Sequence, residues 1–235
     1  MTLSTAFLIV GHRGAAGLEP ENTLRSFARA ITLGVDAVEL DVYSVDGQLV
    51  VIHDDTLERT TNGRGAVMDT PFDALRRLDA GAGELIPTLD EVIDLVAERV
   101  AINIELKGDG TAVPVARCLE ARPNAEILVS SFEHAELGHF RRESPNALVA
   151  PLFHKPSAQM FDVAAALGAW SINLSGRLAT PELLREVARR GYRSLVYTIN
   201  DRSTALALRD AGASGIFTDY PDRMLDLRAS RGVVE

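Results

Sequence analysis

Cysteine, lysine and aromatic residues are all scarce in this chain of 235 residues. Cys118 is the only cysteine, so neither an intramolecular disulfide nor a zinc site built from cysteines can form. A single thiol fits a reducing compartment, and we expect a cytoplasmic protein. Of the 24 basic side chains only Lys107 and Lys155 are lysines, so a specific role for a lysine is worth considering at each position.

Long hydrophobic runs and an excess of positive charge are missing as well. The apolar stretch at residues 6–10 is too short for a secretory signal or a membrane span, and no basic residue precedes it. The net charge of -9 argues against a surface for duplex nucleic acid, because neutralising phosphates requires a basic patch. We therefore expect no nucleic-acid partner and no stable membrane insertion. A local site could still bind a small phosphate ester.

Short apolar runs alternate with longer amphipathic segments along the whole chain. This alternation predicts a TIM (β/α)₈ barrel, which typically takes about 250 residues. A doubly wound sheet is the alternative, but the glycines at 11, 14 and 17 do not match its G-x-G-x-x-G fingerprint. The expected strands are rich in Val, Ile, Leu and Phe and span 7–11, 37–42, 101–106, 126–132, 148–153, 170–175, 194–199 and 215–219.

Residues 43–87 interrupt this alternation. An Asp46-Gly47 pair between two β-like runs predicts a hairpin. A long polar, glycine-containing stretch follows, and loops of this length in compact domains are usually functional. We expect this segment to be an insertion after the second strand that lies over the C-terminal face of the barrel. No linker or low-complexity segment is apparent, so residues 1–235 are interpreted as one domain.

Two of the expected strands carry charged residues in an otherwise apolar setting. Glu39 and Asp41 are two residues apart, so both side chains point to one face of their strand. Asn103, Glu105 and Lys107 repeat this pattern in the strand 101–106 and just after it. In an edge strand such pairs would simply face solvent. Because strands of a parallel sheet are covered on both sides, we expect these side chains to point into the barrel.

Three carboxylates inside a barrel would repel one another and take up protons unless a cation neutralises them. Oxygen ligands favour Mg²⁺ or Ca²⁺ over zinc, so Glu39, Asp41 and Glu105 predict one divalent cation of this kind. Together with Arg13 and Lys107, the occupied site would carry net positive charge. It would then suit a phosphodiester, which carries one negative charge.

Two histidines occupy positions where barrel enzymes carry catalytic groups. His12 follows the first strand in the stretch GHRG, and His53 ends the run LVVIH. His154, just after the fifth strand, is a further candidate. His134 and His139 fall in expected loops or helices and are interpreted as structural or solvated.

Several stretches in fixed order resemble the glycerophosphodiester phosphodiesterase family. They are GHRGAAGLEPENTLRSFARA, VELDVYSVDGQLVVIHDDTLERTTNG, IPTLDEVI and NIELK, followed by VSSF, VYTIN and GIFTDYP. The similarity runs from about residue 8 to 224. It implies a TIM barrel with a small insertion after the second strand, which agrees with the fold expected from the alternating pattern.

The resemblance also implies a role for each group singled out above. Glu39, Asp41 and Glu105 would hold the metal. His12 and His53 would form the general acid/base pair. Arg13 and Lys107 would stabilise the charge of the phosphate. Tyr197 stands where family members often carry tryptophan, and it would line the pocket for the alcohol group.

The expected activity is hydrolysis of a small-molecule glycerophosphodiester to sn-glycerol 3-phosphate and an alcohol. Which histidine is the base, and whether water or the adjacent glycerol hydroxyl attacks phosphorus, stay open. The alternatives are a phosphodiesterase acting on phospholipid headgroups and a non-catalytic barrel that binds glycerol phosphates. The first would need an apolar or basic docking loop, and the second would need no acid/base pair. Besides the small-molecule substrate, the sequence leaves one further partner open, which is a second copy of the chain in a homo-oligomer.

Overall fold

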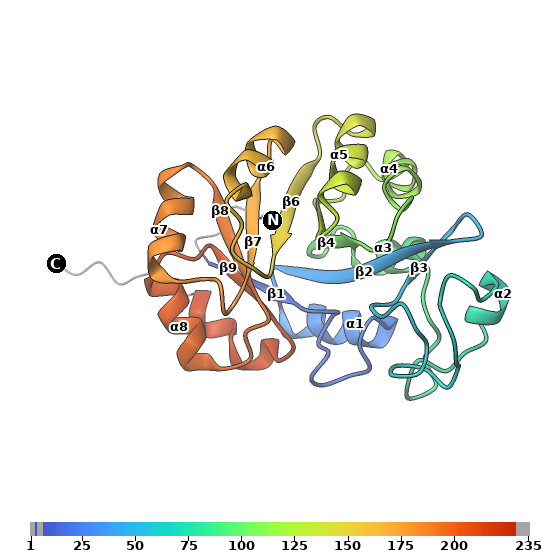
Figure 1. Ribbon diagram of the computed structural model, residues 1–235. Helices are drawn as coiled ribbons and strands as arrows, with labels where there is room; N and C mark the ends of the chain where they lie inside the picture. Colours follow the sequence, from blue (N-terminus) through green and yellow to red (C-terminus); the bar gives the residue numbers. More distant parts are fainter. Residues whose placement is uncertain (1–2, 4–6, 229–235) are drawn as a thin grey trace.

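The computed structural model describes residue 3 and residues 7–228, and these form a closed barrel of parallel strands surrounded by helices (Figure 1). Each barrel strand pairs in parallel with the next, and pairing of the first strand with the second closes the ring. This closure confirms the TIM barrel and rules out the doubly wound sheet. The barrel strands are β1 (Leu8–Gly11), β2 (Ala37–Val45), β4 (Ala101–Leu106), β5 (Ile127–Ser131), β6 (Leu148–Phe153), β7 (Ser171–Ser175), β8 (Arg193–Tyr197) and β9 (Gly215–Thr218).

Helices follow the strands, and two of them begin at the capping residues that the sequence indicates. The Thr88 side chain accepts from the Glu91 backbone N–H, and the Glu91 carboxylate accepts from the Thr88 backbone N–H. These two bonds form the capping box expected there. Thr180 caps the helix that starts at Pro181. The helices are α1 (Leu24–Leu33), α2 (Phe72–Leu75), α3 (Leu89–Val96), α4 (Ala112–Glu120), α5 (His134–Glu143), α6 (Met160–Leu167), α7 (Pro181–Arg189) and α8 (Arg202–Asp210), followed by short 3₁₀ turns at Pro221–Arg223 and Leu225–Arg228.

Two strand ends differ from the prediction by more than one residue. β2 continues to Val45, because Asp46 and Gly47 both have positive φ angles, of 51° and 77°, and turn the chain back as β3 (Gln48–Val51). Such a turn matches the twist of the antiparallel β2–β3 pair. β8 ends at Tyr197, so Ile199 lies beyond the strand in which we placed it.

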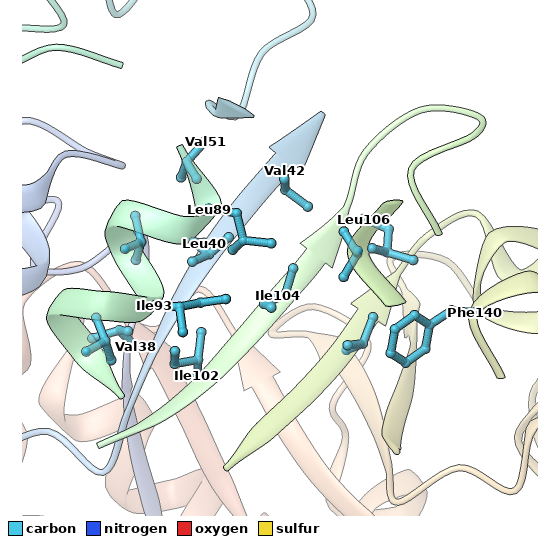
Figure 2. Close-up of a cluster of buried hydrophobic side chains, with 14 of the residues drawn as sticks. Val38, Leu40, Val42, Val51, Leu89, Ile93, Ile102, Ile104, Leu106 and Phe140 are labelled. Carbon is cyan, nitrogen blue, oxygen red and sulfur yellow. The ribbon is translucent and has the colours of Figure 1, made fainter. Parts of the chain in front are cut away.

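The alternation of side chains along β2 and β4 decides which residues reach the site. Figure 2 shows their apolar members, among them Leu40 and Ile104, packed with Leu89 and Ile93 of α3 on the outside of the barrel. The register pairs Asp41 directly with Glu105 on the neighbouring strand. The apolar set is therefore buried under helices, and the polar set points into the barrel, as the two-residue period requires.

Candidate active site

Three carboxylates from β2 and β4 converge at the open end of the barrel. One oxygen each of Glu39, Asp41 and Glu105 lies within 4.8 Å of the other two. Their exposed fractions are 3%, 1% and 9%, so solvent does little to screen their mutual repulsion. Burial, and then the neighbouring carboxylates, raise the pKa of Glu39 well above its usual value and that of Glu105 to about 7.

Two cationic side chains border this cluster, as the sequence pattern indicates. Lys107 Nζ donates to Glu105 Oε1 at 3.0 Å and lies 3.7 Å from Asp41 Oδ1. Arg13 Nε lies 3.4 Å from Asp41 Oδ2, and the Arg13 backbone N–H donates to Glu39 Oε2 at 2.9 Å. Burial alone would lower the pKa of Lys107, but Glu105 and Asp41 outweigh it and raise that pKa.

A sharp turn after β1 brings Arg13 and His12 to the cluster. Arg13 itself has a φ of 51°, which is uncommon for a residue with a side chain, and Gly14 continues with 86°. A Cβ on Gly14 would collide with Ser26 of α1, so glycine is required there. This turn is the structural reason for the GHRG stretch.

A carboxylate orients the ring of His12. His12 Nδ1 lies 2.6 Å from Asp219 Oδ1, and Asn200 Nδ2 donates to the other oxygen of Asp219 at 2.6 Å. Burial opposes ionisation of Asp219, but the bonds from His12 and Asn200 outweigh it and lower its pKa. An ionised carboxylate can only accept, so Nδ1 carries the proton and Nε2 is left for chemistry. That nitrogen is 4.0 Å from Glu39 Oε2.

His53 has the same arrangement with a different partner. Its Nδ1 lies 2.6 Å from Asp54 Oδ1, while Arg59 donates to both oxygens of Asp54. The bonds from Arg59 are the main cause of a lowered pKa at Asp54, which keeps this carboxyl ionised. Burial lowers the pKa of His53, so its imidazole is neutral at pH 7 with Nε2 as a proton acceptor.

Five of the predicted catalytic, phosphate-binding and metal-binding residues line one cavity of about 160 Å³, whereas Asp41 and Lys107 are not part of its described wall. His12 and His53 line it together with Arg13, Glu39 and Glu105, and its remaining wall is apolar or weakly polar: Asn103, Ser130, Phe132, Leu152, Tyr197, Thr198 and Phe217. Ionisable groups beside an apolar wall can accommodate both a phosphodiester and the alcohol group esterified to it.

The other predicted residues lie in different places. Tyr197 lines the cavity, and its ring packs edge-on against Phe132 with centroids 5.8 Å apart. His154 packs against the same Phe132, but it is exposed and is not among the described residues of the cavity wall. His134 bonds the Leu152 carbonyl, in keeping with a structural role.

The insertion flanks this cavity at the C-terminal face of the barrel, where its Arg59 bonds Glu21 of the β1–α1 loop. Of the described cavity residues only His53 comes from 43–87, and α2 lies at the outer edge beside β3 (Figure 1). The reason is an apolar cluster of its own, which includes Leu57, Val67 and Leu75 and packs against Tyr43 and Val50 of the hairpin. Burying these side chains holds the segment against the hairpin.

Sequence reasoning missed the residues that orient the site. Asp219, Asn200 and Asp54 contact the histidines or their carboxylates, yet none was singled out. For Asp219 a signal existed, since it ends the apolar run GIFTD as the carboxylates end theirs. Its distance of 207 residues from His12 hides the pairing.

The cluster has the character of a site for a hard cation. Its donors are all carboxylate oxygens, and Asp41 Oδ1 is buried without a hydrogen-bond partner among the described residues. A buried anionic oxygen of this kind is costly unless a cation offsets its charge. The donor set therefore fits Mg²⁺ or Ca²⁺.

A fold and a site of this kind define a barrel phosphodiesterase, and comparison with known proteins agrees. A model of the glycerophosphoryl diester phosphodiesterase family matches residues 12–223. The chain belongs to this family, which makes it a phosphoric diester hydrolase. No helix within the described ranges has the length and apolar character that crossing a membrane requires.

Individual relatives cover nearly the whole chain. A glycerophosphodiester phosphodiesterase of Caldanaerobacter subterraneus is 33% identical over 94% of this chain and 97% of its own. One from Bacillus altitudinis is 35% identical over 94% and 97%. A phosphodiesterase of Oleispira antarctica, solved with the product sn-glycerol-3-phosphate, superposes with a TM-score of 0.90 at 30% identity, over 95% of this chain and 97% of its own.

Proposed function

We propose that the chain hydrolyses glycerophosphodiesters to sn-glycerol 3-phosphate and an alcohol, with a divalent cation and two histidines. One observation carries the proposal. His12 and His53 line one cavity with Glu39 and Glu105 of the carboxylate cluster, and each has its Nδ1 held by an ionised carboxylate. The product bound in the Oleispira antarctica relative supports the choice of sn-glycerol 3-phosphate.

Glu39, Asp41 and Glu105 would hold the cation. When bound, the cation supplies a Lewis acid for a phosphoryl oxygen. Arg13 and Lys107 add two positive charges beside the same position and stabilise the negative charge that grows on the phosphoryl oxygens.

The two histidines would move protons through Nε2. One takes the proton of the attacking hydroxyl, either water or the neighbouring glycerol hydroxyl, and the other gives a proton to the departing alkoxide. The hydrogen bonds at Nδ1 fix the tautomer and the orientation of each ring and leave Nε2 available for proton transfer. A carboxylate at Nδ1 therefore prepares either histidine for either role.

Glycerophosphocholine with excess Mg²⁺ or Ca²⁺ tests this proposal. We expect choline and sn-glycerol 3-phosphate in equal amounts, measured by ³¹P NMR together with an enzymatic choline assay. Phosphocholine and glycerol as products would contradict the proposal, because the other ester bond would then have broken. Binding of glycerophosphocholine without turnover would favour the non-catalytic barrel.

The carboxylate cluster also predicts how pH changes the stabilising effect of a metal. Because the pKa of Glu105 is raised to about 7 from an ordinary 4.5, the folded metal-free protein binds more protons than the unfolded chain between these values. Its stability therefore falls as pH rises through that window. A divalent cation replaces those protons, so the rise in melting temperature on adding it should be larger at pH 8 than at pH 5.5.

A ligand at 100 times its Kd stabilises a protein by about 2.7 kcal/mol, which corresponds to several degrees in a protein of this size. Differential scanning fluorimetry with Mg²⁺ and Ca²⁺ measures this shift. Glu105→Gln, which cannot ionise, should weaken both the shift and its pH dependence. An equal shift at both pH values in the unmodified protein would contradict the expectation.

A further inference from the structure

Arg59, in the insertion, forms two-point hydrogen bonds with two carboxylates at once. Its Nε and Nη2 donate to Asp54 at 2.6 and 2.8 Å. Its Nη1 and Nη2 donate to Glu21 at 2.7 and 2.8 Å. Asp54 belongs to the insertion, whereas Glu21 lies in the loop between β1 and α1. Arg59 therefore joins two segments that are distant in the sequence.

Each end of this bridge touches a group of the candidate site. Asp54 holds Nδ1 of His53, and Glu21 accepts from Nη1 of Arg13 at 2.7 Å. The Glu21 side chain is 18% exposed, and its loop continues into α1. Among the described residues, His53 is the one member of the insertion that lines the cavity, and its imidazole is bonded to the same carboxylate that Arg59 binds.

Stability alone does not account for this arrangement. The Arg59 side chain is 47% exposed, and ion pairs at such positions contribute about 0–1 kcal/mol to folding. What the guanidinium supplies is geometry, because its planar fork fixes both carboxylates in one orientation. A lysine could not donate in this way to both.

We propose that Arg59 is a positioning residue that anchors Asp54, and through it His53, to Glu21 of the β1–α1 loop. This inference rests on the proposed function, in which His53 transfers a proton. Catalytic geometry is sensitive at this scale, since a displacement of about 1 Å by a remote mutation can cost about 10²-fold in rate.

Arg59→Met tests the bridge, with Arg25→Met as its matched control. Arg25 is 52% exposed and pairs with Glu19 of the same loop, but it does not contact the site. We expect Arg59→Met to lower kcat on glycerophosphocholine by about 10–100-fold, with KM changed less than threefold and melting unchanged. Arg59→Lys should fall between, and Arg25→Met should match the unmodified enzyme. Full kcat in Arg59→Met would overturn the proposal.

A double-mutant cycle separates positioning from a general structural effect. If Arg59 acts through Asp54, Arg59→Met should change kcat little once Asp54→Ala has already released His53. If the fold-losses in kcat of the two single variants multiply in the double variant, Arg59 does not act through Asp54 and the proposal is contradicted. This outcome does not depend on whether either single variant is slightly destabilised, provided that melting is measured for all four proteins.

The imidazole signals of His53 test the bridge without turnover. In ¹H–¹⁵N spectra of the metal-free protein, assigned with His53→Ala, we expect a single Nδ1–H tautomer in the unmodified protein and an averaged signal in Arg59→Met. Identical spectra would count against the bridge. If the unmodified protein shows no turnover with any divalent cation, the proposed function fails while the spectra still decide the bridge.

Discussion

Replacing either His12 or His53 by alanine is expected to reduce kcat on glycerophosphocholine by about 10²–10⁴-fold, the usual contribution of a single proton transfer. Each ring is held at Nδ1 by its own carboxylate, at 2.6 Å in both cases, so neither ring can take over the position of the other. Steady-state kinetics with sn-glycerol 3-phosphate as the measured product gives both values.

His139→Ala is the matched control for this pair. His139 lies on α5 and contacts Glu136, away from the cavity, so its loss should leave kcat unchanged. Thermal melting and metal binding should be preserved in all three variants. Undiminished turnover in His12→Ala or His53→Ala would remove that residue from the mechanism.

Removing divalent cations is expected to have the second large effect. The three clustered carboxylates are almost fully buried, and the positive charges of Arg13 and Lys107 do not balance them. Excess chelator should therefore lower turnover to the level of an enzyme-free control, and added Mg²⁺ or Ca²⁺ should restore it. Restoration by one cation and not the other would identify the preferred ion.

Glu105→Gln should show the same loss even with saturating cation, because an amide oxygen carries no negative charge for the ion. Asp90→Asn is the matched control, since Asp90 is an exposed carboxylate paired with Arg122 on the outer surface. Full activity in excess chelator would contradict the metal site, although the fold and the family would still stand.

Patterns within a few residues of one another were enough to predict the barrel and its polar centre. Glu39 and Asp41 share a face because side chains alternate along a strand, and Leu40 between them packs outward on α3 (Figure 2). That Asp41 meets Glu105 follows once their strands are neighbours in a parallel barrel. Local periodicity and the order of the strands therefore carried this part of the prediction.

Contacts between distant loops lay beyond such patterns. The bond between Arg59 and Glu21 spans 38 residues and depends on how the insertion folds against the hairpin. The apolar cluster of Leu57, Val67 and Leu75 determines that arrangement, and its residues show no regular period. The sequence of this polar, irregular stretch therefore predicted neither its small apolar core nor the contact of Arg59 with Glu21.

The most direct test of the central claim is anomalous X-ray scattering from crystals soaked in Mn²⁺, a scattering substitute for Mg²⁺ or Ca²⁺. We predict one strong peak among the carboxylate oxygens of Glu39, Asp41 and Glu105, and its loss in Glu105→Gln crystals. Well-ordered crystals of an active enzyme with no peak there, or with a peak only elsewhere, would contradict a metal-dependent phosphodiesterase site at this position.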